Sequence, residues 1–68
     1  MTLSARNHLQ GTIDDVQLGD VLVHVTITTA AGVIESVITR RSFEEMALKK
    51  GDTVTAVVKA TEVMIAKG

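Results

Sequence analysis

Two short segments, one near each end of the chain, combine hydrogen-bond donors with small residues. Their members are Ser4, Ala5 and Arg6 in the first segment and Lys59, Ala60 and Thr61 in the second. They supply two hydroxyls and two fixed positive charges, and the small residues let the backbone come close enough to a ligand for its N–H groups to donate. A site with many donors and no carboxylate is suited to a compact oxyanion. These segments are therefore the candidate binding site.

The length and composition favour a small domain that needs partner subunits. The chain has 68 residues, and we expect a single domain over residues 1–68. A core of that size gives marginal stability, and the chain has no Cys for a disulfide or a thiolate metal site. His8 and His24 are too few for a zinc centre unless carboxylates help. Because 46% of the residues are hydrophobic, we expect apolar surface to be buried between copies of the chain.

The charge balance and the lack of long apolar runs argue against several kinds of partner. The net charge is −1, whereas a non-specific nucleic-acid binder normally carries a basic excess. Phe43 is the only aromatic residue, so a surface for stacking bases is also missing. No apolar run approaches the length of a membrane span, and no secretory signal pattern opens the sequence. We therefore expect a cytoplasmic protein that binds neither nucleic acid nor membrane.

The chain is predicted to be mostly β-structure. Apolar and polar residues alternate through residues 21–28, which is the pattern of a half-buried strand. The turn residues 29–32 predict a hairpin with the next strand. Gly11 is expected to introduce a bulge or bend where a small barrel turns a corner. In all, we predict five strands, at residues 7–16, 21–28, 33–39, 53–59 and 63–66.

One short helix is predicted between the third and fourth strands, at residues 42–47. Ser42 and Glu45 have the spacing of a capping box, in which each side chain caps the backbone N–H of the other. Phe43 and Met46 then begin an apolar stripe with helical spacing. Five strands with a helix at this point predict an all-β fold, a small OB-like barrel.

The chain resembles the molybdate-binding Mop proteins, also called molbindins, over essentially its whole length. The residues that carry the resemblance are Ser4-Ala5-Arg6-Asn7 with Leu9 and Gly11, Val37-Ile38-Thr39, and Lys59-Ala60-Thr61-Glu62-Val63-Met64. The resemblance implies an OB-like barrel and a hexamer built as a trimer of dimers. It also implies that molybdate or tungstate binds between subunits.

The resemblance also implies roles for residues in the first half of the site. Ser4 matches a serine whose hydroxyl donates to an oxo group of the anion, and Ala5 continues the same segment. Arg6 matches an arginine that contributes chiefly through its backbone N–H. Thr39 matches a threonine that a partner subunit supplies.

The second half of the site is carried over in the same way. Lys59 matches a lysine that supplies positive charge. Ala60 and Thr61 offer backbone N–H groups, and Thr61 adds a hydroxyl. Asn7 and His8, next to the first segment, are possible additional members. The Mop proteins also have a second class of site near the three-fold axis, to which no residue of this sequence is assigned, and no residue is expected to bind a metal cation directly.

The chemistry of the anion accounts for these residue types. Molybdate is a tetrahedral dianion whose oxygens only accept hydrogen bonds at neutral pH, and none of the assigned positions is acidic. Sulfate has the same charge and shape but is smaller, so donors that are fixed for molybdate should reject it. Tungstate is nearly the same size as molybdate and should bind similarly.

These observations leave two main hypotheses for function. The first is molybdate and tungstate binding for intracellular molybdenum storage or homeostasis. The alternative is an anion-sensing regulatory or assembly module that reports the molybdate level to a partner protein. An enzyme is not expected, because Ser4, His8 and His24 do not form a nucleophile–base–orienter series and so small a barrel leaves little room for a cleft.

Overall fold

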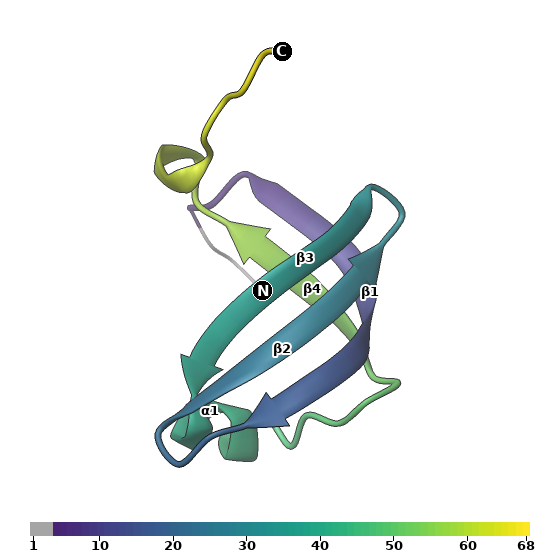
Figure 1. Cartoon of the computed structure of the whole chain (residues 1–68), viewed down its shortest axis with the longest axis vertical. Helices are drawn as coiled ribbons and strands as arrows, with labels where there is room; N and C mark the ends of the chain where they lie inside the picture. Colours follow the sequence, from purple (N-terminus) through teal and green to yellow (C-terminus); the bar gives the residue numbers. More distant parts are fainter. Residues whose placement is uncertain (1–3) are drawn as a thin grey trace.

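The computed structural model describes residues 4–68, and in that part of the chain four antiparallel strands form one curled sheet (Figure 1). In chain order the elements are β1 (Asn7–Leu18), β2 (Leu22–Thr29), β3 (Gly32–Thr39), the helix α1 (Arg40–Glu45), β4 (Thr53–Val58) and the 3₁₀ turn η1 (Ala60–Glu62). The strands lie in the order β3-β2-β1-β4, so β3 and β4 are the two edges of the sheet. The predicted all-β class and the short helix before the fourth strand are confirmed.

The core lies on the inner face of the curled sheet. Val23, Val25 and Ile27 alternate along β2, and all three are buried together with Ile13 of β1 and Ala56 of β4. The alternation predicted for this strand is therefore confirmed from Val23 onward, whereas Val21 precedes β2 and is exposed. Partly buried apolar side chains surround this centre: Leu9, Val16, Ile34, Ile38, Phe43, Leu48 and Val54.

The bulge in β1 does not fall at Gly11, where the sequence predicted it. The pairing of β1 with β2 shifts between Ile13 and Asp15, so Asp14 is the extra residue. Ile13 and Val16 are three residues apart and would face opposite sides of a regular strand. The extra residue turns both side chains towards the core.

Gly11 allows β1 and β2 to approach closely, and Gly11→Ala is expected to destabilise the protein. An added Cβ would lie 2.5 Å from the carbonyl oxygen of Thr28 and 2.8 Å from the Cγ2 atom of Ile27, so the strands would have to separate. Overpacking of this kind costs about 1–3 kcal/mol in free energy of unfolding. Urea unfolding at a fixed protein concentration should show the loss, whereas exposed Thr12→Ala on the same strand should cost less than about 1 kcal/mol. Equal losses for the two variants would contradict this role of Gly11.

The helix α1 begins two residues earlier than predicted, because Thr39 rather than Ser42 is its N-cap. The Thr39 Oγ1 atom accepts a hydrogen bond from the Ser42 backbone N–H at 3.1 Å and donates to the Ser42 Oγ atom at 3.0 Å. Glu45 pairs with Arg41 at 3.1 Å instead of reaching back to the cap. The predicted capping box is therefore wrong, and the last residue of β3 performs the capping. In the described residues, neither α1 nor η1 is long and apolar enough to cross a membrane.

The predicted fifth strand, residues 63–66, is not formed within this chain. After η1 the backbone leaves the sheet and extends away from it (Figure 1). Val63, Met64 and Ile65 are 49%, 92% and 90% exposed. A strand needs a neighbouring edge to pair with, and this segment lies beside none in the described part of the chain.

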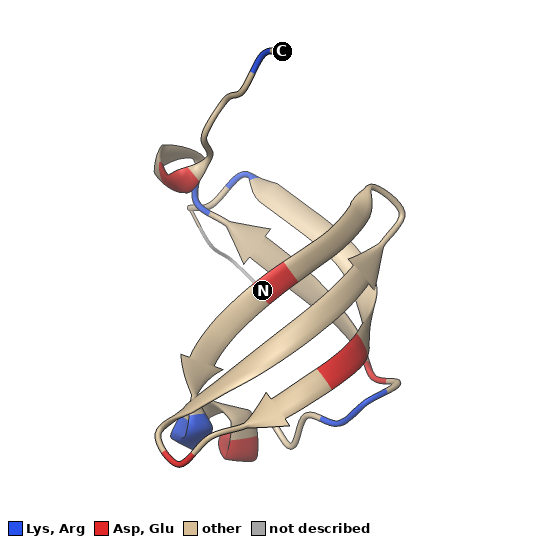
Figure 2. Ribbon diagram, viewed as in Figure 1, with Lys and Arg blue, Asp and Glu red and all other residues tan. Residues whose placement is uncertain are grey.

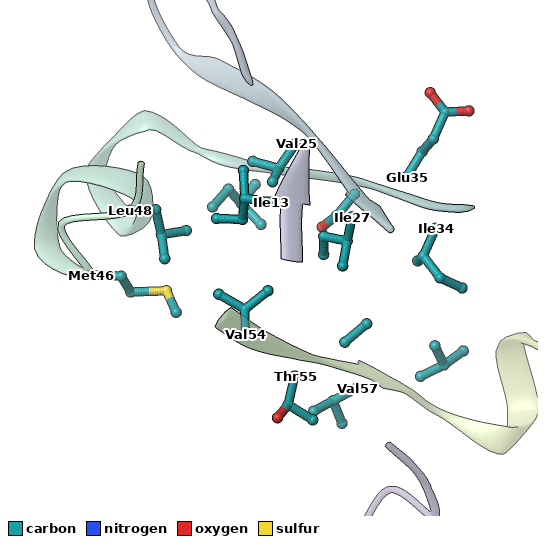
Figure 3. A pocket seen from close by; sticks show the side chains of 14 residues that line it. Ile13, Val25, Ile27, Ile34, Glu35, Met46, Leu48, Val54, Thr55 and Val57 are labelled. Carbon is teal, nitrogen blue, oxygen red and sulfur yellow. The ribbon is translucent and has the colours of Figure 1, made fainter. Parts of the chain in front are cut away.

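An apolar groove separates the two edge strands, β3 and β4. The cavity within it has a volume of about 240 Å³. In Figure 3, Ile13 and Ile27 lie on one side of this space and Val54 lies on the other. The sheet is therefore curled but not closed.

Candidate oxyanion site

The fold brings the two candidate segments together at one end of the sheet. Asn7 pairs with Val58 at the end of the ladder between β1 and β4. Residues 4–6 precede that pair and residues 59–61 follow it, so both segments continue beyond the same end (Figure 1). We call residues 4–6 and 59–61 together the donor end. It contains six of the predicted site residues: Ser4, Ala5, Arg6, Lys59, Ala60 and Thr61.

The donor end is accessible, and its backbone amides are available. All of its residues are exposed except Ala5, which is half-buried. Among the hydrogen bonds between residues 4–68, none is donated by a backbone N–H of residues 4–6 or 59–61. These amides, the hydroxyls of Ser4 and Thr61 and the Lys59 ammonium give a surface that is rich in donors.

Positive charge exceeds negative charge at the donor end. Figure 2 shows basic positions in both segments, close to the acidic position in η1. The basic residues are Arg6 and Lys59, and the acidic one is Glu62. In the described part of the chain, neither Arg6 nor Lys59 takes part in an ion pair. Both charges are therefore available to an anion.

A second basic cluster, at the start of α1, is neutralised by neighbouring carboxylates. Arg40 lies 3.6 Å from Glu44, and Arg41 lies 3.1 Å from Glu45. Arg40 also donates to the carbonyl of Gly19 at 3.3 Å. This cluster is therefore a weaker candidate for anion binding than the donor end.

Thr39 lies at the opposite end of the sheet from the donor end. It ends β3 and pairs with Leu22 at the start of β2, whereas the donor end adjoins the start of β1 (Figure 1). Its hydroxyl already caps α1. One chain therefore does not bring Thr39 to the other predicted residues.

Asn7 and His8 lie beside the donor end, and their side chains bond to backbone carbonyls. The Asn7 Nδ2 atom donates to the carbonyl of Val58 at 3.2 Å. The His8 Nε2 atom lies 2.8 Å from the carbonyl of Ala5. Sequence reasoning missed the Asn7 contact, because no spacing pattern marks a side chain that bonds across 51 residues.

Comparison with known proteins identifies relatives over nearly the whole chain. The TOBE domain family matches residues 3–65. Molybdenum-pterin-binding protein 2 of Clostridium pasteurianum is 44% identical over 66 residues, which cover 96% of this chain and 97% of the relative.

Solved structures match the fold closely. A molybdate-binding protein from Sporomusa ovata superposes with a TM-score of 0.93 at 34% identity, covering 98% of this chain and 100% of that one. ModG with molybdate bound, described as a cytoplasmic molybdate-binding protein, gives a TM-score of 0.82 at 39% identity over 88% of this chain and 43% of ModG. The curled sheet with one short helix thus matches the OB-like fold of the Mop structures, as the sequence resemblance implied. This chain therefore belongs to the TOBE domain family and, within it, to the molybdenum-pterin-binding Mop proteins.

Proposed function

We propose that the chain binds molybdate at the donor end. The observation that carries this proposal is the meeting of two segments, distant in the sequence, whose amides, hydroxyls and positive charges all favour an anion. Relatives whose names state that they bind molybdate support the same ligand.

The number of donors is sufficient for tight binding. Molybdate oxygens only accept hydrogen bonds, and a hydrogen bond to a charged group contributes about 1.5–3 kcal/mol net. About five such bonds would give sub-micromolar affinity, which requires more than about 8 kcal/mol, after several kcal/mol are lost to association. The same chemistry accepts tungstate, so we include tungstate in the proposal.

The position of the single Phe favours the bare oxyanion over a pterin as the ligand. A pterin ring is planar and gains much of its binding from stacking on aromatic side chains. The only aromatic residue, Phe43, lies on α1 and packs against the core. It is therefore not available to a ligand at the donor end.

We propose that the site is completed in a homo-oligomer, namely a hexamer built as a trimer of dimers. The resemblance to Mop proteins supports the hexamer, and the apolar groove between β3 and β4 together with exposed Met64 and Ile65 supports association. In this assembly residues 63–66 of one chain pair in the groove of another, which completes a five-stranded barrel. A neighbouring chain also supplies Thr39 to the donor end.

The proposed role is reversible binding for molybdenum storage or homeostasis in the cytoplasm, not catalysis. The description of ModG as cytoplasmic supports the location. The two histidines support a non-catalytic role, since His8 bonds to the Ala5 carbonyl and His24 lies 2.9 Å from Glu35. Neither contact is with the hydroxyl of Ser4 or Thr61.

Selectivity among oxyanions tests the proposal. Calorimetry should give similar dissociation constants for molybdate and tungstate. Sulfate should bind at least about 100-fold more weakly, because its S–O bonds are too short for its oxygens to reach donors that are spaced for molybdate. Phosphate should also bind weakly, because near neutral pH it carries protons that face only donors. Sulfate binding within about tenfold of molybdate would rule out the proposed function.

Two lysine variants locate the site in the same experiment. Lys59→Ala should weaken molybdate binding by about tenfold or more, the effect of removing one charge-assisted bond. Lys49→Ala is the matched control, because Lys49 lies in a loop outside the donor end and pairs with Asp52 at 3.3 Å. An equal effect of the two variants would place the anion elsewhere.

A further inference from the structure

The side-chain contacts of Asn7 and His8 each fix one peptide group at the donor end. A peptide unit is planar, and its C=O and N–H point in opposite directions. The Val58 carbonyl belongs to the same unit as the Lys59 N–H, and the Ala5 carbonyl belongs to the same unit as the Arg6 N–H. A side chain that holds either carbonyl therefore also sets the direction of the amide behind it.

The two contacts act on the two segments separately. Asn7 Nδ2 donates to the Val58 carbonyl at 3.2 Å and so ties β1 to the peptide group that opens the second segment. His8 Nε2 lies 2.8 Å from the Ala5 carbonyl and holds the middle of the first segment. Because a carbonyl only accepts, the imidazole must carry a proton on Nε2 for this bond to form.

We propose that Asn7 and His8 are positioning residues that aim the Lys59 and Arg6 amides at the bound anion and thereby set its size selectivity. This inference rests on the proposed function. Donors with fixed directions match one length of metal–oxygen bond, and reorientation to fit a shorter anion would break the hydrogen bonds that hold the two carbonyls. Without those hydrogen bonds the Arg6 amide, and to a smaller extent the Lys59 amide that the β1–β4 pairing also restrains, can reorient towards a smaller anion.

A positioning residue differs from a ligand, and from a residue that only stabilises the fold, in how its removal changes the affinities for different oxyanions. Removal of a ligand would weaken every oxyanion, since each uses the same donors. Loss of stability alone would lower the fraction of folded protein and would also affect every oxyanion equally. Loss of positioning lowers the affinity for molybdate and leaves that for sulfate nearly unchanged. The ratio of the two affinities is therefore the informative quantity.

The test compares full-length wild-type protein with Asn7→Ala, His8→Ala and His8→Gln. Calorimetry gives the dissociation constant of molybdate, and competition against molybdate gives that of sulfate. His8→Gln restores a neutral N–H donor at a similar distance along the side chain. Gln10→Ala removes an exposed amide side chain from the same strand, opposite Thr55, and is the matched control.

We expect Asn7→Ala and His8→Ala to weaken molybdate binding about tenfold and sulfate binding by less than about threefold. His8→Gln and Gln10→Ala should keep the wild-type ratio. An unchanged ratio in both alanine variants, with wild-type protein binding molybdate tightly, would overturn this inference and leave the proposed function standing. Wild-type protein that binds no molybdate would overturn both.

Discussion

Replacement of Arg6 by proline is expected to abolish molybdate binding, whereas replacement by alanine should weaken it by less than about tenfold. Proline removes the backbone N–H, which is the group proposed to contact the anion. Alanine keeps that N–H and removes only an exposed guanidinium, whose attraction is reduced by water. Calorimetry on the two variants measures the difference directly.

Neither Arg6 variant is expected to change the fold, and this can be checked separately from binding. Arg6 precedes β1, so proline at this position removes no hydrogen bond of the sheet. The far-ultraviolet circular dichroism spectrum and the native mass should therefore match those of the wild type. If Arg6→Ala lost as much affinity as Arg6→Pro, the guanidinium rather than the amide would be the ligand.

The double variant Met64→Asp, Ile65→Asp is expected to dissociate the proposed oligomer into single chains. Each side chain is at least 90% exposed in one chain, and burial of such a residue stabilises an interface by about 1.5–3 kcal/mol. An aspartate in the apolar groove would have no partner for its charge. Light scattering at micromolar protein should show the mass of one chain.

Lys67→Asp is the matched control for that variant. It introduces the same acidic side chain into the same C-terminal segment, at a position that is charged already. Its native mass should equal that of the wild type. If the double variant kept the wild-type mass, the segment at residues 63–66 would have no part in assembly.

The parts of the fold that depend on local patterns could be predicted from the sequence. The alternation in β2 and the turn before β3 required only neighbouring residues, and the observed hairpin follows both. The bulge was misplaced because glycine was the visible signal, whereas the need to bury both Ile13 and Val16 decided the position. The helix start was missed because Thr39 ends a strand and caps a helix at once.

The candidate site was predictable in its residues more than in its geometry. Residue types around Ser4 and Lys59 indicated an oxyanion, and the resemblance indicated that the two segments meet. The contact of Asn7 with the Val58 carbonyl depends on the register of β1 against β4, which no local pattern contains. The predicted last strand did not form within one chain, because residues 63–66 lie beside no free edge in the described part of the chain.

The pairing of β1 with β4 determines when, during synthesis of the chain, the donor end can form. A ribosome releases residues 4–6 well before residues 59–61, which follow Val58 and lie beside them at the same end of the sheet. The hairpin of β2 and β3 can form earlier, since its contacts are close in sequence. A prematurely terminated chain that ends before Lys59 would carry the first segment alone. An anion that needs both segments can therefore bind only after residues 59–61 have been translated and β4 has paired with β1.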